Sequence, residues 1–166
     1  MTLLAWDKRL SIGPPSVDTQ HKLLVEALNE LHSAVMRGET REVTGLLLRT
    51  FLVYTRNHHA SEESLMLKVD YPELRQHQAL HRELEQVLET HLTRLERGES
   101  SLGLEFLLFV RDWLTSHIQK MDRAYTPWIL RHTTAQARTS LTAGHTSNES
   151  WVDANSGAGF TSDAKS

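Results

Sequence analysis

Histidines and carboxylates at helical spacing are the residues of this chain best suited to chemistry. His58 and Glu62 are four residues apart, and His77 and His81 repeat that spacing further along the chain. Residues four apart project from one face of an α-helix, one turn from each other. Imidazole nitrogen and carboxylate oxygen are good ligands for iron, manganese and zinc. The pairs therefore predict a metal site, although either pair alone also arises by chance in a chain with ten histidines.

Three more polar residues interrupt apolar stripes in the same way. His21 stands on the first stripe of the chain, and His117 and Asp122 follow the last one. A buried imidazole or carboxylate is costly unless it is paired or coordinated. A single inward histidine is more often a hydrogen-bonded core residue than a ligand. Such groups on four stripes together, however, predict a dinuclear metal site.

The spacing of His117 and Asp122 does not fit a regular α-helix. Five residues at about 100° per residue place the two side chains about 140° out of phase. Both can reach one site only if the carboxylate reaches far or if the helix contains a local π-type distortion. The sequence leaves both possibilities open.

Four apolar stripes must position these residues. Large apolar side chains recur at steps of three and four over residues 21–35, 43–65, 74–95 and 106–117, as in amphipathic helices. The sequence has no alternating strand pattern and no Asn-Gly hairpin signal. Helices of about 20 residues with short links pack as antiparallel neighbours. The expected fold is all-α, an up-down-up-down antiparallel four-helix bundle.

Capping and breaking residues mark the expected ends of these helices. The candidates are Asp18 or Thr19 and Gly38 for the first helix, Thr40 for the second, Pro72 and Gly98 for the third, and Ser101 for the fourth.

Both ends of the chain differ from the stripes. The residues before Asp18, among them Trp6 and Gly13, predict an extended N-terminal arm that covers one side of the bundle. Residues 133–166 are rich in Ser, Thr, Ala, Gly and Asn, and they have too little apolar surface to offset the entropy of ordering. We expect a bundle domain at 1–132 and a disordered Ser/Thr/Gly/Ala-rich C-terminal tail at 133–166.

Composition excludes several classes of protein. The absence of cysteine excludes a disulfide scaffold, a thiolate zinc site and an iron–sulfur cluster. A net charge of −3 gives no electrostatic footprint for nucleic acid. The N-terminus lacks the pattern of a secretory signal, and no apolar run approaches the roughly 18–20 residues of a membrane span. We therefore expect a cytoplasmic protein without nucleic-acid partners or membrane insertion.

The motifs that carry these residues resemble the hemerythrin family, and closely its single-domain bacteriohemerythrins. The matching segments, spread over residues 4 to 130, are DTQH at 18–21, HHASEE at 58–63, HQALH at 77–81 and WLTSHIQKMD at 113–122. Trp6, Gly13 and Tyr125 agree as flanking residues. The five-residue spacing between His117 and Asp122 is itself a feature of that family.

The resemblance implies a non-haem di-iron centre with two iron ions. One iron would bind His77, His81 and His117, the other His21 and His58, and Glu62 and Asp122 would bridge them together with an oxo or hydroxo group. Five bonds at the second iron then leave one position open, which in the family takes O2.

The resemblance also implies reversible O2 binding, for oxygen storage, transport or delivery to oxygen-requiring enzymes, and not catalysis. The alternatives are a di-iron oxidoreductase that reduces peroxide or nitric oxide, and an oxygen or redox sensor on the same site. A bundle that holds zinc or no metal is a further alternative.

The residues around the seven candidate ligands carry weaker expectations. Trp113, Leu114 and Ile118 are expected to line a dry pocket, although Trp113 equally suits plain core packing. His32 is expected to pack in the core and Glu63 to lie at the surface. His59 is expected at the surface or between helices, with a place beside the metal ligands as a further alternative.

Overall fold

The computed structural model describes the backbone of residues 2–145 and the side chains of residues 2–135. The chain divides into two units, Met1–Leu130 and Arg131–Ser166. Its helices are α1 (Pro15–Met36), α2 (Arg41–Lys68), α3 (Leu74–Glu96), α4 (Leu104–His117) and α5 (Arg123–His145), with a π-helical turn, η1 (Ile118–Asp122), between α4 and α5. The described residues contain no strand, so the predicted all-α class is confirmed.

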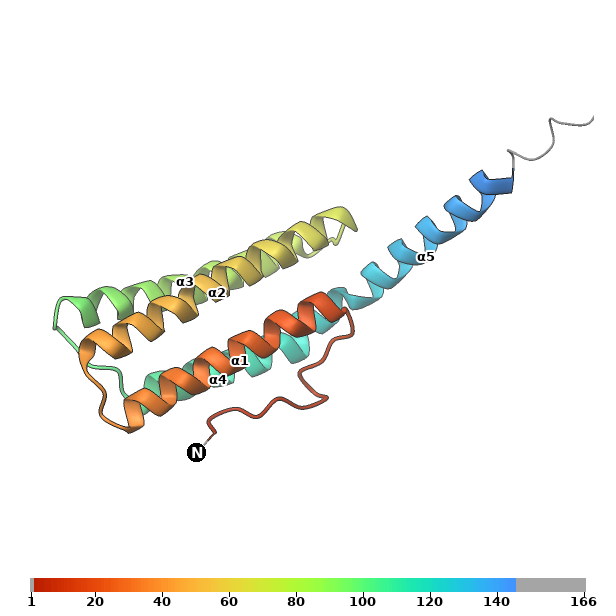
Figure 1. The fold of residues 1–166 in the computed structure, drawn as a ribbon. Helices are drawn as coiled ribbons and strands as arrows, with labels where there is room; N and C mark the ends of the chain where they lie inside the picture. The colour runs from red at the N-terminus through yellow and green to blue at the C-terminus, as the bar shows by residue number, and fades with distance from the viewer. Residues whose placement is uncertain (1, 146–166) are drawn as a thin grey trace, which may run out of the picture. The chain divides into compact units, whose positions relative to one another are not determined.

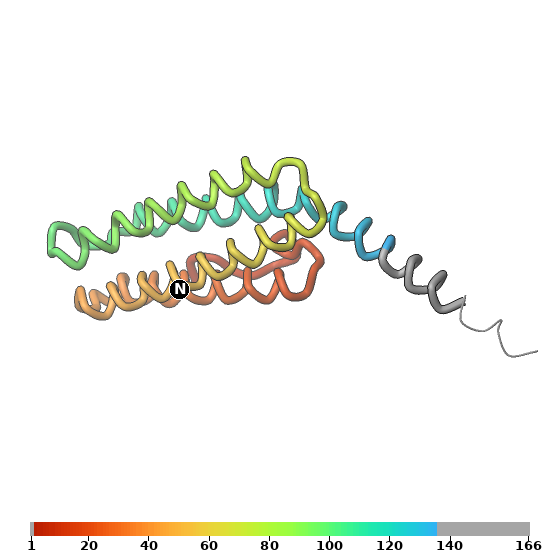
Figure 2. The backbone as a smooth tube through the Cα atoms, turned by 90° about the horizontal axis from the view of Figure 1, so that it is seen from above, coloured from red at the N-terminus to blue at the C-terminus, as the bar shows by residue number. Residues whose placement is uncertain are grey.

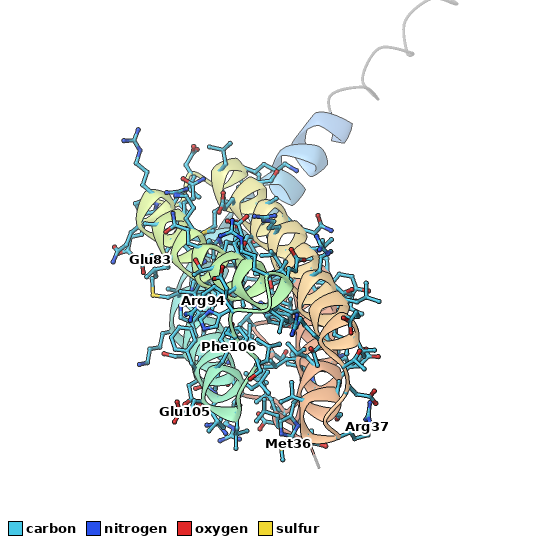
Figure 3. All side chains as sticks on the ribbon, turned by 90° about the vertical axis from the view of Figure 1, so that its left-hand side faces the viewer. Met36, Arg37, Glu83, Arg94, Glu105 and Phe106 are labelled. Carbon is cyan, nitrogen blue, oxygen red and sulfur yellow. The ribbon has the colours of Figure 1, made fainter. Side chains whose placement is uncertain are left out.

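The first unit is an up-down-up-down bundle of four antiparallel helices, as expected. In Figure 1, α2 and α3 form one layer and α1 and α4 form the other, and Figure 2 shows the same helices side by side from above. α1 packs on α2 and α4, and α2 packs on α3. Side chains fill the space between the four helices (Figure 3).

The core follows the predicted apolar stripes. Leu28, Leu48, Leu88 and Leu107 come from the four bundle helices, and none of them has more than a trace of exposure. Each helix therefore turns one apolar face inward, and the polar residues on those faces become buried as well.

Helix ends agree with the sequence where glycine or threonine marks them. Gly38 and Gly98 have φ values of 69° and 72°, a left-handed conformation that ends α1 and α3. The Thr40 hydroxyl accepts a hydrogen bond from the Val43 N–H at 3.4 Å and caps α2.

Three predicted helix starts are wrong. α1 begins at Pro15 and not at Asp18, because a proline at the first helical position loses no hydrogen bond. α3 begins at Leu74, after a turn that contains Pro72, and α4 begins after Gly103 and not at Ser101.

The N-terminal arm covers the bundle as predicted. Leu10 and Ile12 are buried in the core. Asp18 in the first turn of α1 accepts hydrogen bonds from the Ile12 N–H at 2.8 Å and the Ser11 hydroxyl at 2.5 Å. Asn29 holds the start of the arm by accepting from the Leu4 N–H and donating to the Leu4 carbonyl.

The last helix runs into the segment that was predicted to be a tail. α5 continues past residue 132 to His145. Continuing an existing helix costs far less than starting one, so a segment without an apolar stripe can extend it. The remainder of the predicted tail lies outside the described residues. Within the described part of the chain, no helix is both long and apolar enough to cross a membrane.

Candidate metal centre

The bundle brings all seven predicted ligands together in its interior. They come from every bundle helix, and each is at most 6% exposed. The residues are His21 from α1, His58 and Glu62 from α2, His77 and His81 from α3, His117 from α4 and Asp122 from η1.

These side chains form two overlapping groups of possible metal ligands, and within each group the ligand atoms lie within 4.8 Å of one another. We call them the three-histidine group and the two-histidine group. The three-histidine group contains His77, His81 and His117, the two-histidine group contains His21 and His58, and both contain Glu62 and Asp122. The two carboxylates are therefore placed between the groups.

Asp122 faces each group with a different oxygen. Its Oδ1 lies 3.2 Å from His77 Nε2 and 3.1 Å from His117 Nε2. Its Oδ2 lies 3.2 Å from His21 Nε2. One carboxylate that presents its two oxygens to two sets of imidazoles can bridge two cations.

The π-helical turn explains how Asp122 reaches the cluster. α4 ends at His117 and η1 spans the next five residues, ending at Asp122. A π-turn closes its hydrogen bonds over five residues instead of four, so residues five apart come to one face. Of the two possibilities that the spacing left open, the local distortion is the one in the structure.

Hydrogen bonds from outside the cluster set the tautomers of two imidazoles. His81 Nδ1 lies 2.9 Å from Glu63 Oε1, and His58 Nδ1 lies 3.2 Å from Gln20 Oε1. Both partners are acceptors, so Nδ1 carries the proton and Nε2 directs its lone pair into the cluster.

Glu63 corrects an expectation from the sequence. Its side chain is only 25% exposed and faces α3, where it also accepts from the Gln78 amide at 3.0 Å. A rotation of about 100° from Glu62 points away from the bundle axis but towards the neighbouring helix, not towards solvent. Position on the helical wheel alone did not separate these two directions.

The inward-facing atoms of the cluster fit a bound cation. His77 Nε2 and His81 Nε2 lie 3.0 Å and 3.1 Å from His117 Nε2. A neutral imidazole has only one N–H to donate, so hydrogen bonds do not pair all three nitrogens well. Among the described residues, both Asp122 oxygens, Glu62 Oε2 and both His21 nitrogens are buried without a hydrogen-bond partner. Convergent lone pairs and carboxylate oxygens fit a bound metal ion, which would satisfy them together.

Three ligands of this interior rest in the form that binds metal, and His77 does not. Burial is the main cause that lowers the pKa of His58 to about 4, so this imidazole is neutral at pH 7. Burial alone would raise the pKa of Glu62 and Asp122, but the surrounding imidazoles hold both pKa values below their usual range. Neutral imidazoles and charged carboxylates are the forms that bind metal ions. Burial alone would lower the pKa of His77, but the carboxylates of Asp122 and Glu62 raise it to about 9, so a metal ion would displace its proton.

Tyr125 is a site residue that the sequence placed only as a flanking match. Its hydroxyl donates to Glu62 Oε1, and both side chains are fully buried. The signal in the sequence is the spacing of three residues from Asp122, which puts both on one side of the helix.

Two aromatic rings lie flat against imidazoles of the three-histidine group. Trp113 stacks on His117 with ring centroids 4.3 Å apart and planes at 11°. His59 stacks on His81 at 3.6 Å and 3°. Trp113 thus contacts the cluster directly. His59 lies between α2 and α3 and beside a candidate ligand, two of the places expected for it.

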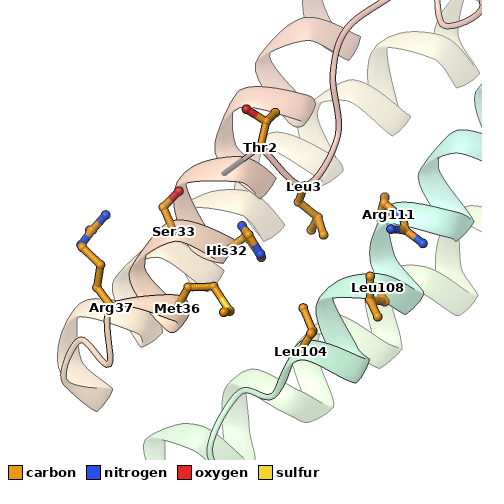
Figure 4. A pocket seen from close by; sticks show the side chains of 9 residues that line it. All are labelled: Thr2, Leu3, His32, Ser33, Met36, Arg37, Leu104, Leu108 and Arg111. Atoms are coloured by element: carbon orange, nitrogen blue, oxygen red, sulfur yellow. The ribbon is translucent and has the colours of Figure 1, made fainter.

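A cavity of about 640 Å³ lies away from the cluster, between the end of α1 and the start of α4. Leu3, Met36, Leu104 and Leu108 contribute to its lining, and none of the seven cluster residues does (Figure 4). His32 also reaches it and is only 7% exposed, in agreement with its predicted packing role.

Known proteins similar in sequence to this chain come from a family of cation-binding domains. Residues 15–129 match the family described as Hemerythrin HHE cation binding domain. The chain is 31% identical to a bacteriohemerythrin of Stenotrophomonas maltophilia over 87% of this chain and 93% of that one. It is 32% identical to a bacteriohemerythrin of Methylococcus capsulatus, over 76% and 97%.

A solved structure extends the agreement to the fold. A crystal structure of wild-type hemerythrin superposes with a TM-score of 0.73 at 31% identity, covering 76% of this chain and 98% of the other. The matched region contains the arrangement of helices that builds the buried His/Glu/Asp cluster. The chain belongs to the hemerythrin family.

Proposed function

We propose that this protein binds O2 reversibly at a non-haem di-iron centre. His77, His81 and His117 would hold one iron, His21 and His58 the other, and Glu62 and Asp122 would bridge them. The observation that carries this proposal is the pair of unequal ligand groups that share both carboxylates. When bound, iron at the two-histidine group, which has one imidazole fewer, supplies a free coordination position for O2.

The chain holds the charges of the site in place. Glu62 and Asp122 are fully buried, and the imidazoles around them keep their pKa values low. Two buried negative charges compensate part of the charge of two metal ions, which a neutral pocket could not do. The Tyr125 hydroxyl keeps its proton because burial strongly raises its pKa, and it donates that proton to Glu62 Oε1 in a hydrogen bond.

The surroundings of the site favour binding over turnover. Leu114 and Ile118, which flank His117 along the chain, are buried, at 4% and 0% exposure. A dry apolar enclosure limits the supply of protons to a bound ligand. His81 and His58 hold their Nδ1 protons in hydrogen bonds to Glu63 and Gln20. We therefore infer storage or delivery of O2 to oxygen-requiring enzymes, and not an oxidoreductase.

The test is a spectroscopic titration with O2. Purified protein is reduced without oxygen, its iron is counted per chain, and O2 is admitted and removed while the visible spectrum is recorded. We expect two irons per chain and an absorption band that rises with O2 and falls when O2 is removed. Irreversible oxidation with steady consumption of a reductant would instead identify the oxidoreductase. Zinc, or no metal, would refute the di-iron site.

A further inference from the structure

His59 is a buried titratable residue beside the cluster that the seven candidate ligands leave without a role. It is 3% exposed and follows His58 on α2. Its ring lies almost parallel to that of His81, with 3.6 Å between the centroids. A polar ring in this place is costly unless its nitrogen has a partner.

Glu85 of α3 is that partner. His59 Nδ1 lies 2.5 Å from Glu85 Oε1, and Glu85 Oε2 lies 3.7 Å from Arg56 Nε. A carboxylate oxygen accepts, so His59 donates its Nδ1–H to Glu85. The hydrogen bond to His59 in turn lowers the pKa of Glu85. A charged acceptor therefore fixes the orientation of the His59 ring.

His81 is thereby held from two directions. The hydrogen bond from its Nδ1 to Glu63 fixes one edge of the ring, at 2.9 Å. That bond alone still permits the ring to tilt, and the stacked face of His59 opposes the tilt. Trp113 does the same for His117 at 4.3 Å and 11°. Two of the three imidazoles of the three-histidine group thus have a ring against one face.

We propose that His59, oriented by Glu85, is a positioning residue that holds the His81 imidazole in its metal-binding orientation. The inference rests on the metal site of the proposed function and adds a residue to it that does not itself bind metal. Groups that orient a metal-ligating histidine commonly change metal affinity by about 10–100-fold when they are removed.

Cobalt(II) is the probe for this inference, because its visible spectrum reports the geometry of its ligands whether or not the protein binds O2. The full chain is loaded with cobalt alone, and its release to a chelator is timed. We expect His59→Ala to shift the cobalt bands and to speed release by about tenfold or more. His59→Phe keeps a ring against His81 and should recover most of the wild-type retention.

Glu85 and Glu89 offer a matched pair of variants. Both carboxylates pair with Arg56, but only Glu85 also contacts His59 among the described contacts. Glu85→Ala should therefore speed cobalt release and alter the cobalt bands, whereas Glu89→Ala should leave both unchanged. This pair also tests the inference if His59→Ala fails to fold.

The outcomes are distinct. Wild-type release rates and bands in His59→Ala, or equal behaviour of the two glutamate variants, would overturn the positioning role. A chain that takes up no cobalt would overturn the metal site and this role together. In another outcome, the wild-type chain binds cobalt and the variants respond as expected, while the iron form does not bind O2 reversibly. That result would refute the proposed function and leave the role of His59 in place.

Discussion

Replacing Tyr125 with phenylalanine removes one hydroxyl from the centre of the bundle and little else. The ring is fully buried, so phenylalanine keeps its packing against Tyr71 and His77. What is lost is the hydrogen bond to Glu62 Oε1. The other oxygen of that carboxylate already lacks a hydrogen-bond partner among the described residues. The variant therefore takes from the Glu62 charge the hydroxyl that donates to it.

The magnitude follows from the charge and the burial of Glu62. A hydrogen bond to a charged group contributes about 1.5–3 kcal/mol, and we take about 2 kcal/mol here. In a chain of this size that loss lowers the melting temperature by about 4–8 °C. Expressed as metal affinity, about 2 kcal/mol is roughly a 30-fold loss, within the range expected when a group that orients a ligand is removed.

Tyr71→Phe is the matched control. Its hydroxyl donates to Glu73 at 3.2 Å in a partly buried place away from the seven cluster residues. Thermal unfolding of both variants, with and without iron, and iron release to a chelator measure the difference. If Tyr125→Phe unfolds and releases iron as Tyr71→Phe does, the argument that Tyr125 holds Glu62 is refuted.

Four further outcomes are expected. His77→Ala should bind fewer than two irons per chain by metal analysis and melt at a lower temperature, because metal binding contributes to folding. In the metal-free protein, stability in urea should fall as the pH drops from 6.5 towards 4, because His58 protonates near 6.5 when unfolded but near 4 when folded. Gly38→Ala should destabilise the protein by about 1–2 kcal/mol, because its φ of 69° is left-handed. At Gly45, inside α2, an added Cβ would lie 3.8 Å from Leu95 Cδ2, which is an ordinary contact. Gly45→Ala should therefore stabilise the protein by up to about 1 kcal/mol in the same urea assay.

Each of these outcomes has its contrary. Two irons in His77→Ala would contradict its place in the three-histidine group. A flat stability profile below pH 6.5 would contradict a neutral, buried His58. Equal effects of Gly38→Ala and Gly45→Ala on stability would contradict the argument from φ. An added Cβ is not crowded at either position, and of the two only Gly38 has a left-handed φ.

The helical pattern and the meeting of the seven polar residues could be predicted from the sequence. Apolar periodicity determines which face of each helix turns inward, and His21, His58 and His81 lie on those faces. The position of Asp122 required a distortion that the five-residue spacing already indicated.

The partners of the seven residues could not be predicted in the same way. Glu63 and Glu85 lie between neighbouring helices, where a small rotation of either helix decides between solvent and a contact. Helix starts failed for a related reason, since several residues near Pro15 and Ser101 could each begin a helix. A cytoplasmic location and the domain boundary at residue 132 stay predictions.

The π-helical turn makes the spacing between α4 and α5 sensitive to a single residue. Deleting one residue from 118–121 would let the turn close as an ordinary α-helix, with better hydrogen-bond geometry. With the deletion, Asp122 would stand four residues after His117 and would still project from the same face, whereas the same closure at full length would turn Asp122 and Tyr125 together by about 100°. The ordinary helix is therefore open to this site only with one residue fewer, and a full-length chain that relaxed to it would lose two neighbours of the Glu62 carboxylate in one step.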